Sequence, residues 1–282
     1  MNGTAVLLIT CPDQKGLVAS VSGLLYNFGA NITHADQHQD HDEGLFFMRV
    51  EWLLEGFDLE GFRAAFAPLA ERFKMDWRLQ LSEKKPRVAI FVSQHLHCLA
   101  DLLHRHQLGE FACEIVMIVS NHTNAAALAK FHGIEFHHVP VTAECKEAAE
   151  ERQLALLEQA GVELVVLARY MQVLSSCFVA RYPYAVINVH HSFLPAFIGA
   201  RPYHAAFRRG VKLIGATSHY VTEALDDGPI IEQDVARISH RDQVHDLIAQ
   251  GRDLERVVLS RAVKWHIGGR IVSYRNKTVI FD

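Results

Sequence analysis

The chain has 282 residues, 21% of them charged and 50% hydrophobic, which is enough for one large or two ordinary domains with buried cores. Its formal net charge of −4 excludes a global positive field of the kind that attracts nucleic acid or anionic membranes. The excess of negative charge lies within residues 1–85, whereas residues 86–282 carry equal numbers of positive and negative side chains. We therefore expect neither a nucleic-acid partner nor a membrane partner.

The apolar runs and the cysteines both point to a soluble cytoplasmic protein. No run approaches the ~20 apolar residues that a membrane span requires, and residues 1–10 lack the positive region of a signal peptide. The cysteines are odd in number, far apart and without a C-x-x-C pair, as is typical of reduced thiols. They are Cys11, Cys98, Cys113, Cys145 and Cys177.

The first 81 residues predict the order strand, helix, strand, strand, helix, strand. Apolar residues recur at helical spacing over 17–28 and again over 62–73, and Gly29 follows the first helix as a good terminator. The predicted strands are residues 5–10, 30–37, 45–53 and 76–81, with a polar hairpin tip over 38–44. This βαββαβ order predicts a ferredoxin-like domain.

Residues 82–87, Ser-Glu-Lys-Lys-Pro-Arg, combine four charges with a proline and predict a linker. Beyond it, predicted strands over 87–92, 111–119, 163–168 and 184–187 alternate with predicted helices over 97–107, 124–132 and 147–160. The pattern predicts an α/β domain over 88–282 with a doubly wound, mostly parallel sheet. Ligands of such sheets bind beyond the carboxyl ends of the strands.

Candidate catalytic residues follow the strand over 184–187. Asn188 and His190 are two residues apart, so a continuing strand would direct both side chains to one face. Asp226 lies in a polar loop that Gly228 and Pro229 force to turn. An amide and a protonated imidazole can stabilise an oxyanion, while a carboxylate orients the imidazole or accepts a proton, which suits acyl hydrolysis or transfer.

Each of these residues also has an ordinary structural use. Asn and Asp often stabilise turns, and His190 could be a hydrogen-bonded histidine without a catalytic role. We expect His191 to point away from His190, because side chains alternate along a strand.

The order of the residues is more specific than their types. Segments 188–195, 199–206, 215–221 and 225–231 resemble the 10-formyltetrahydrofolate-dependent formyltransferase family, and the resemblance covers residues 86–282. The family's catalytic Asn, His and Asp fall on Asn188, His190 and Asp226. The resemblance also implies folate binding through the loop at 167–174 and the segment 219–226. The residues concerned are Met171, Gln172, Leu174, His219 and Thr222.

Two departures from that family indicate a subfamily. Its glycinamide ribonucleotide enzymes cradle a substrate phosphate on a glycine-rich turn after the first strand, whereas residues 91–99 here contain no glycine. Residues 11–17 and 29–32 resemble an ACT domain, a small-molecule regulatory module. The combination is that of the formyltetrahydrofolate deformylases. It implies hydrolysis of 10-formyltetrahydrofolate to tetrahydrofolate and formate without a cofactor, supplying formate for purine biosynthesis and balancing the folate pool.

The ACT resemblance implies that residues 1–81 pair between subunits of a dimer or tetramer. It further implies that they bind an amino-acid effector, methionine or glycine, near Asp13, Gly16 and Asn31. Two simpler interpretations stay open: a strand-to-helix turn stabilised by Asp13, and a surface used only for dimerisation.

Two other functions also stay open. The first is a formyltransferase with an amine acceptor. The missing phosphate cradle and the lack of net positive charge on residues 86–282 disfavour nucleotide and tRNA acceptors. A non-catalytic folate or amino-acid sensor is disfavoured by the intact catalytic set.

The histidine clusters do not match a metal-binding pattern. They are His34, His38 and His41; His95 and His97; His104 and His106; and His137 and His138. We therefore predict no metal.

Overall fold

The computed structural model describes residues 3–196 and 202–282. The start of one family-like motif, Gly199, Ala200 and Arg201, lies outside the described residues. The chain divides into two compact units. The first comprises Met1–Lys85 with Gly269–Val272 and Val279–Asp282, and the second comprises Pro86–Gly268 with Ser273–Thr278.

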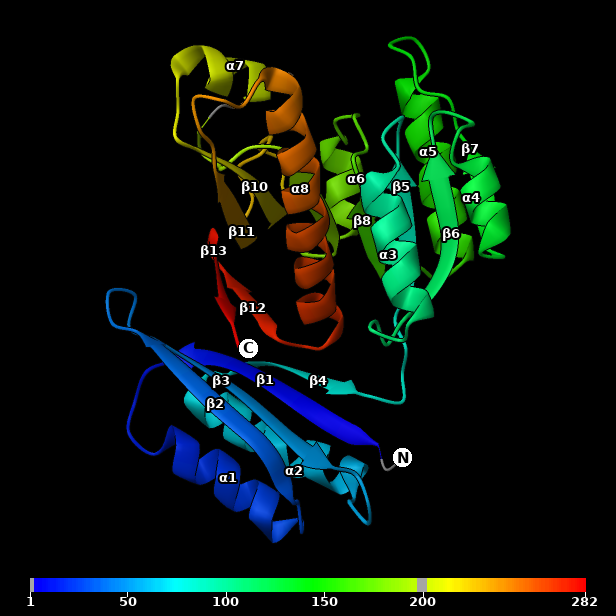
Figure 1. Cartoon of the computed structure of the whole chain (residues 1–282). Coiled ribbons are helices and arrows are strands. Elements are labelled where there is room, and N and C mark those ends of the chain that lie inside the picture. Colours follow the sequence, from blue (N-terminus) through cyan, green and yellow to red (C-terminus); the bar gives the residue numbers. More distant parts are fainter. Residues whose placement is uncertain (1–2, 197–201) are drawn as a thin grey trace. The chain divides into compact units, whose positions relative to one another are not determined.

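The first unit has the predicted βαββαβ order. Its elements are β1 (Thr4–Pro12), α1 (Leu17–Asn27), β2 (Ile32–Asp40), β3 (Leu45–Leu53), α2 (Leu59–Phe73) and β4 (Asp76–Leu81). The strands form one antiparallel sheet in the order β2-β3-β1-β4, and Figure 1 shows both helices on one face of it. The ferredoxin-like prediction is confirmed. Strand β2 reaches Asp40, so the hairpin tip is shorter than the sequence suggested.

The helix-facing side of this sheet carries the apolar core. Trp52, Phe62 and Phe66 are fully buried there, with the Phe62 ring 5.5 Å from each of the other two ring centroids. This contact explains the helical stripe over 62–73, since large aromatic side chains dominate core energetics.

The C-terminal pieces of the first unit contact a buried arginine of its sheet. Arg49 of β3 is only 3% exposed. Its Nε donates to the carbonyl oxygen of Gly269 at 3.0 Å, and its Nη2 pairs with Glu51 at 2.8 Å. A buried charge without such partners would be strongly destabilising. The sequence prediction assigned all of 88–282 to the second domain, and it differs from the structure at these pieces.

The second unit alternates strands and helices as predicted. Its elements are β5 (Arg87–Val92), α3 (His97–Gln107), β6 (Glu114–Ser120), α4 (Ala126–Phe131), β7 (Glu135–His138), α5 (Lys146–Gln159), β8 (Leu164–Leu167), α6 (Ser176–Arg181), β9 (Val186–His190), α7 (Pro202–Arg209), β10 (Leu213–Tyr220), β11 (Ile230–Arg237) and α8 (Val244–Ile267). A hairpin of β12 (Ile271–Tyr274) and β13 (Lys277–Ile280) is divided between the units.

The sheet of the second unit has the order β11-β10-β9-β8-β5-β6-β7. Strands β7, β6, β5, β8 and β9 run parallel, whereas β10 is antiparallel to both β9 and β11. The prediction of a mostly parallel, doubly wound sheet is confirmed. None of the described helices is both long and apolar enough to cross a membrane.

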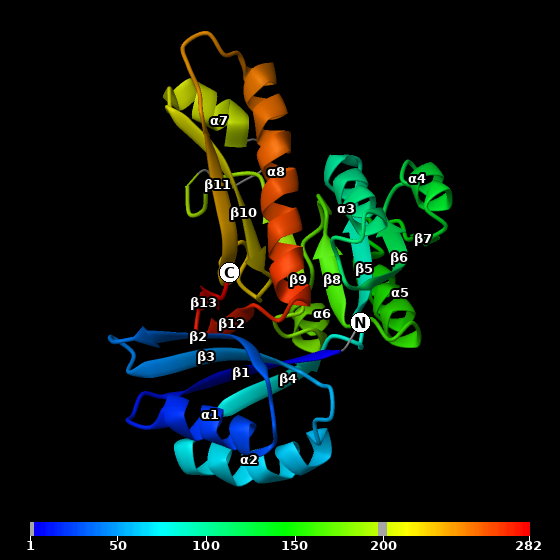
Figure 2. The ribbon, with the colours of Figure 1, turned by 60° about the horizontal axis from the view of Figure 1, so that its bottom comes forward.

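The winding of the sheet determines where a ligand can bind. Strand β5 lies between β8 and β6, and Figure 2 shows these strands between α3 on one side and α5 and α6 on the other. Connections that leave a sheet on opposite faces open a crevice at the carboxyl ends of the strands. Helix α8 packs against β10, β11 and α3.

Candidate active site

Strand pairing brings the first candidate residues together. Strands β9 and β10 are antiparallel, with Asn188 opposite His219 and His190 opposite Thr217. Directly opposed residues share a face of the sheet, and so do residues two apart in one strand. One face of this strand pair therefore presents Asn188, His190 and His219. Asn188 and His190 share this face because strand β9 extends as far as His190.

Asp226 reaches the same place from the loop before β11. Its Oδ2 lies 3.2 Å from His190 Nδ1, and both side chains are nearly buried, at 12% and 7% exposed. The hydrogen bond from His190 is the main reason that the pKa of Asp226 lies below its ordinary value, so the carboxyl is ionised at neutral pH. The other ring nitrogen, His190 Nε2, is buried without a hydrogen-bond partner.

The backbone of the loop explains how Asp226 is held. Asp226 has a φ of 55°, a left-handed conformation that aspartate tolerates better than most residues. A Cβ on Gly228 would lie 1.8 Å from the carbonyl oxygen of Tyr220, so only glycine fits there. The amide of Tyr220 donates to the carbonyl oxygen of Pro229 at 2.9 Å, which closes the turn. The neighbouring Asp227 is exposed to solvent.

His219 determines how Asn188 is oriented. Its Nδ1 lies 2.8 Å from the carbonyl oxygen of Tyr220, which can only accept, so Nδ1 carries the proton. Burial lowers the pKa of His219 and favours the neutral ring, whose Nε2 then accepts from Asn188 Nδ2 at 3.3 Å. The amide nitrogen of Asn188 is thereby assigned to the side facing His219. The sequence singled out His219 for folate binding and did not identify this contact.

The candidate residues border one cavity of about 340 Å³. Every predicted catalytic and folate-binding position contributes to its lining: Met171, Gln172, Leu174, Asn188, His190, His219, Thr222 and Asp226. The lining also includes residues that the sequence did not single out as site residues. Among them are Arg169, Tyr170, His191, Val221 and Leu225.

The loop after β8 is fixed to the scaffold at both ends. The amide of Met171 donates to Ser93 Oγ at 3.0 Å, and the amide of Ser175 donates to a carboxylate oxygen of Glu150 at 3.1 Å. Gln153 donates to the buried hydroxyl of Tyr170, the residue before Met171. The side chain of Met171 is nevertheless 50% exposed, so the loop offers an apolar rim to the cavity.

The expectation for His191 is wrong. Its ring stacks on that of His190, with the centroids 5.1 Å apart and the planes 25° from parallel. Strand β9 ends at His190, so the alternation of side chains does not extend to the next residue. His191 also lines the cavity.

The three predicted effector residues do not meet within one chain. Gly16 has a left-handed φ of 90° beside the exposed Asp13, whose carboxylate accepts from the Gln39 side chain. In the register of the sheet, Asp13 follows the end of β1 whereas Asn31 precedes the start of β2, and these ends are opposite. At 3.3 Å per residue the separation is about 25 Å, too far for one small ligand.

Comparisons with known proteins match both parts of the chain. The family model described as formyl transferase matches residues 86–263, and the one described as ACT domain matches residues 5–54. A formyltetrahydrofolate deformylase of Synechocystis sp. is 53% identical to this chain over 99% of both sequences. The chain belongs to the formyltetrahydrofolate deformylase family.

Further members of the family are similar over nearly their whole lengths. The Bacillus subtilis formyltetrahydrofolate deformylase is 50% identical and covers 98% of this chain and 93% of its own. The crystal structure of a formyltetrahydrofolate deformylase from Pseudomonas syringae pv. tomato has a TM-score of 0.97 and 48% identity, covering 100% of this chain and 95% of that one. The resemblance inferred from the motifs is therefore confirmed.

Proposed function

We propose that this member of the deformylase family hydrolyses 10-formyltetrahydrofolate to tetrahydrofolate and formate, supplying formate for purine biosynthesis and balancing the folate pool. The observation that carries the proposal is the His190–Asp226 pair at 3.2 Å, whose remaining ring nitrogen is buried without a partner. An ionised carboxylate and an unpaired imidazole nitrogen in a cavity are suited to moving a proton and to stabilising an oxyanion.

The chemistry follows from these positions. A water oxygen forms a bond to the formyl carbon, and the formyl oxygen takes the negative charge. Asn188 and protonated His190 stabilise that charge, while Asp226 holds the imidazole and helps to remove the proton from water. The bond from carbon to N10 then breaks, N10 takes a proton to give tetrahydrofolate, and formic acid releases a proton to give formate.

Binding of the folate is assigned to the rest of the cavity. Met171, Gln172 and Leu174 lie on the loop after β8, and His219 and Thr222 lie on and after β10. An apolar cavity wall with a few directed polar groups suits a pteridine ring. Asn188 keeps one amide N–H for the substrate because the other faces His219.

The experiment is an acceptor-free assay: purified protein receives 10-formyltetrahydrofolate alone, and formate and tetrahydrofolate are measured together. We expect both products in equal amounts. If formate forms only after an amine is added, or the formyl group moves to the amine, the protein is a transferase. The missing glycine-rich phosphate turn at 91–99 favours water over a phosphorylated acceptor.

We also propose that residues 1–81 form a regulatory domain, followed by a linker over 82–87 and a catalytic domain over 88–282 without the C-terminal pieces that belong to the first unit. Asp13 and Gly16 lie at one end of the sheet and Asn31 at the other, so one amino acid can contact all three only where two copies pair. Calorimetric titration of the full chain with methionine and glycine tests this proposal, and the variants Asp13→Asn and Asn31→Ala are titrated in the same way. Coupling to the substrate of about 5–150-fold is expected. No binding of either amino acid would leave the domain a dimerisation surface.

The remaining parts of the proposal concern the setting of the enzyme. We propose a cytoplasmic homo-oligomer, a dimer or tetramer, that needs no cofactor for the reaction. The proposal is supported by the proton-transfer groups already in the cavity, which suffice for hydrolysis of a formyl amide. Light scattering gives the oligomer size, and retention of turnover after exhaustive chelation tests the independence from metal.

A further inference from the structure

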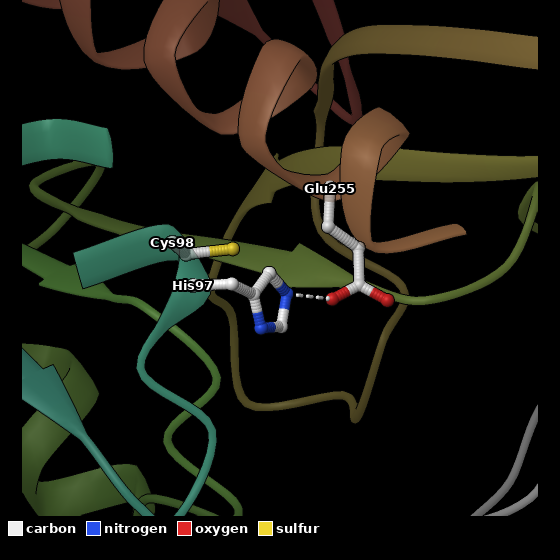
Figure 3. Close-up of side chains that lie close together, drawn as sticks. All are labelled: His97, Cys98 and Glu255. Carbon is white, nitrogen blue, oxygen red and sulfur yellow. Dashed lines mark hydrogen bonds and ion pairs between the residues drawn. The ribbon is translucent and has the colours of Figure 1, made fainter. Parts of the chain in front are cut away.

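A second buried ionic cluster lies in the same unit, between α3 and α8. His97 Nε2 is 2.7 Å from Glu255 Oε2, and the Tyr203 hydroxyl donates to Oε1 at 2.9 Å. Figure 3 shows the histidine ring directed at the carboxylate, with Cys98 beside it. Glu255 is only 1% exposed. Burial acts to raise its pKa, but His97 and Arg169 outweigh that effect and hold the pKa below its usual value.

The cluster has metal-ligand residue types, and a cation of the protein already faces its carboxylate. His97, Cys98 and Glu255 place potential ligand atoms within 4.8 Å of one another, the one such group among the described residues. Burial beside Glu255 raises the pKa of Cys98 well above its usual value, which favours the neutral thiol over the thiolate. Arg169 Nε lies 3.4 Å from the same carboxylate and already supplies the positive charge.

Arg169 connects this cluster to the cavity of the candidate active site. It follows β8 with a left-handed φ of 63°, and its carbonyl oxygen accepts from the amide of Ser93 after β5. Its side chain is 11% exposed and lines the same cavity as Asn188 and His190. The guanidinium therefore lies at the carboxyl ends of β5 and β8, where the sheet opens its crevice.

Two nitrogens of the Arg169 guanidinium have no hydrogen-bond partner. Although Glu255 lies within ion-pair distance, the geometry forms no hydrogen bond, and both Nε and Nη1 are buried without a partner. Unpaired buried donors are unfavourable, and charged ones more so. Arginine stays protonated, and its guanidinium nitrogens bind carboxylates through charge-assisted hydrogen bonds. A small carboxylate is therefore a suitable acceptor for these nitrogens.

We propose that Arg169 is the binding site for the formate product. The inference rests on the proposed function, because hydrolysis creates a carboxylate in this cavity whereas transfer to an amine does not. Water adds its oxygen to the formyl carbon, one proton of the water passes to N10 as the bond to N10 breaks, and the released formic acid loses its remaining acidic proton to become an anion. Arg169 binds the formate anion. Glu255 positions Arg169, and Tyr203 and His97 hold the Glu255 carboxylate in place.

The test measures formate binding apart from turnover. Saturation-transfer NMR follows the single carbon-bound proton of formate in the presence of the full-length protein without folate, with ionic strength held constant by chloride. Product inhibition by formate and by tetrahydrofolate is measured in parallel. For Arg169→Gln we expect formate affinity to fall about tenfold or more, the loss expected for a charged hydrogen-bonded pair, while the tetrahydrofolate inhibition constant stays the same.

Two further variants keep the test decisive. Arg169→Lys retains the charge next to Glu255 and hence the fold, but loses the planar fork, so formate affinity should fall by about threefold to tenfold. The control Arg252→Gln removes an exposed arginine from the same helix as Glu255 and should bind formate like the wild type.

The outcomes separate the two proposals. Unchanged formate affinity in folded Arg169→Gln or in Arg169→Lys would overturn the formate site, as would a parallel rise in both product inhibition constants. A wild type that shows no transfer signal at a formate concentration equal to its inhibition constant would do the same. Failure of the acceptor-free reaction overturns the hydrolase proposal, and the NMR experiment still decides whether Arg169 binds formate.

Discussion

Two histidine–carboxylate pairs in one unit have nearly the same local geometry and different surroundings. His190 and Asp226 are 3.2 Å apart, and His97 and Glu255 are 2.7 Å apart. Asp226 has a second oxygen facing His219 at 3.8 Å, and His190 leaves a ring nitrogen unpaired. Both oxygens of Glu255 are occupied by hydrogen bonds.

The difference shows that a short histidine–carboxylate distance does not define a catalytic pair. Proton transfer requires a ring nitrogen that is not already hydrogen-bonded, and of the two pairs the one that lines the cavity has such a nitrogen, His190 Nε2. The Glu255 pair instead satisfies a buried negative charge and directs Arg169. We therefore expect loss of the first pair to affect the rate and loss of the second to affect stability.

The largest expected effect is on turnover. His190→Ala and Asp226→Asn should each lower kcat by about 100-fold or more, because oxyanion and proton-transfer groups act mainly in the transition state. Steady-state kinetics with 10-formyltetrahydrofolate measures this, and KM should change little. Asp227→Asn, an exposed neighbour, is the matched control and should be mild. Near-normal kcat in a folded variant removes that residue from the mechanism.

The second prediction concerns Glu255 and stability. Removing one partner of a buried ion pair leaves the other charge uncompensated, so Glu255→Ala should lower the free energy of unfolding by about 3 kcal/mol or more. Asp226→Asn should lower it by no more than about 1 kcal/mol. Urea denaturation of both variants makes the comparison. If Glu255→Ala keeps its stability and loses turnover as severely as Asp226→Asn, the division of roles between the pairs is wrong.

A third, smaller effect is expected at His219. Because its Nε2 accepts from Asn188, replacing it frees the amide to rotate and weakens one oxyanion donor. We expect His219→Gln to lower kcat by about tenfold, less than direct removal of a donor. His219→Phe should be more severe than His219→Gln, since phenylalanine cannot accept a hydrogen bond. Equal kcat in the two variants would show that the acceptor is not what orients Asn188.

The smallest effect is on the pH dependence of stability. Burial lowers the folded-state pKa of His219 below 6.5, so the unfolded chain binds the proton more readily. Stability from this group is fully present above the unfolded pKa and is lost as pH falls toward the folded pKa. Urea midpoints should therefore fall between about pH 7.5 and about pH 5.5, and His219→Gln should show a smaller fall. An identical fall in both proteins contradicts the assignment.

The pattern of apolar residues was enough to predict both folds. The stripes over 17–28 and 62–73 became α1 and α2, and the alternation after residue 86 became the mostly parallel sheet. Asn188, His190 and Asp226 were singled out by the resemblance of the ordered motifs to a known family rather than by spacing alone, and all three line one cavity. Local patterns of this kind are what a sequence records most directly.

Longer-range contacts could not be predicted in the same way. Arg169 and Glu255 are far apart in sequence, and they meet because the chain brings α8 against α3 and β9 and the loop after β8 to the same place. His191 was misplaced because the end of β9 is not visible in the sequence. The separation of Asp13 from Asn31 depends on the sheet register, which one sequence does not reveal.

The most direct test of the central claim is the origin of the oxygen in formate. A reaction run in water enriched with ¹⁸O, without any acceptor, is quenched early and the formate is examined by mass spectrometry. Attack by water on the formyl carbon predicts one labelled oxygen in each formate, with label appearing at least about 100-fold more slowly in Asp226→Asn. Unlabelled formate, or formate that appears only with an added amine, would contradict hydrolysis at the His190–Asp226 pair.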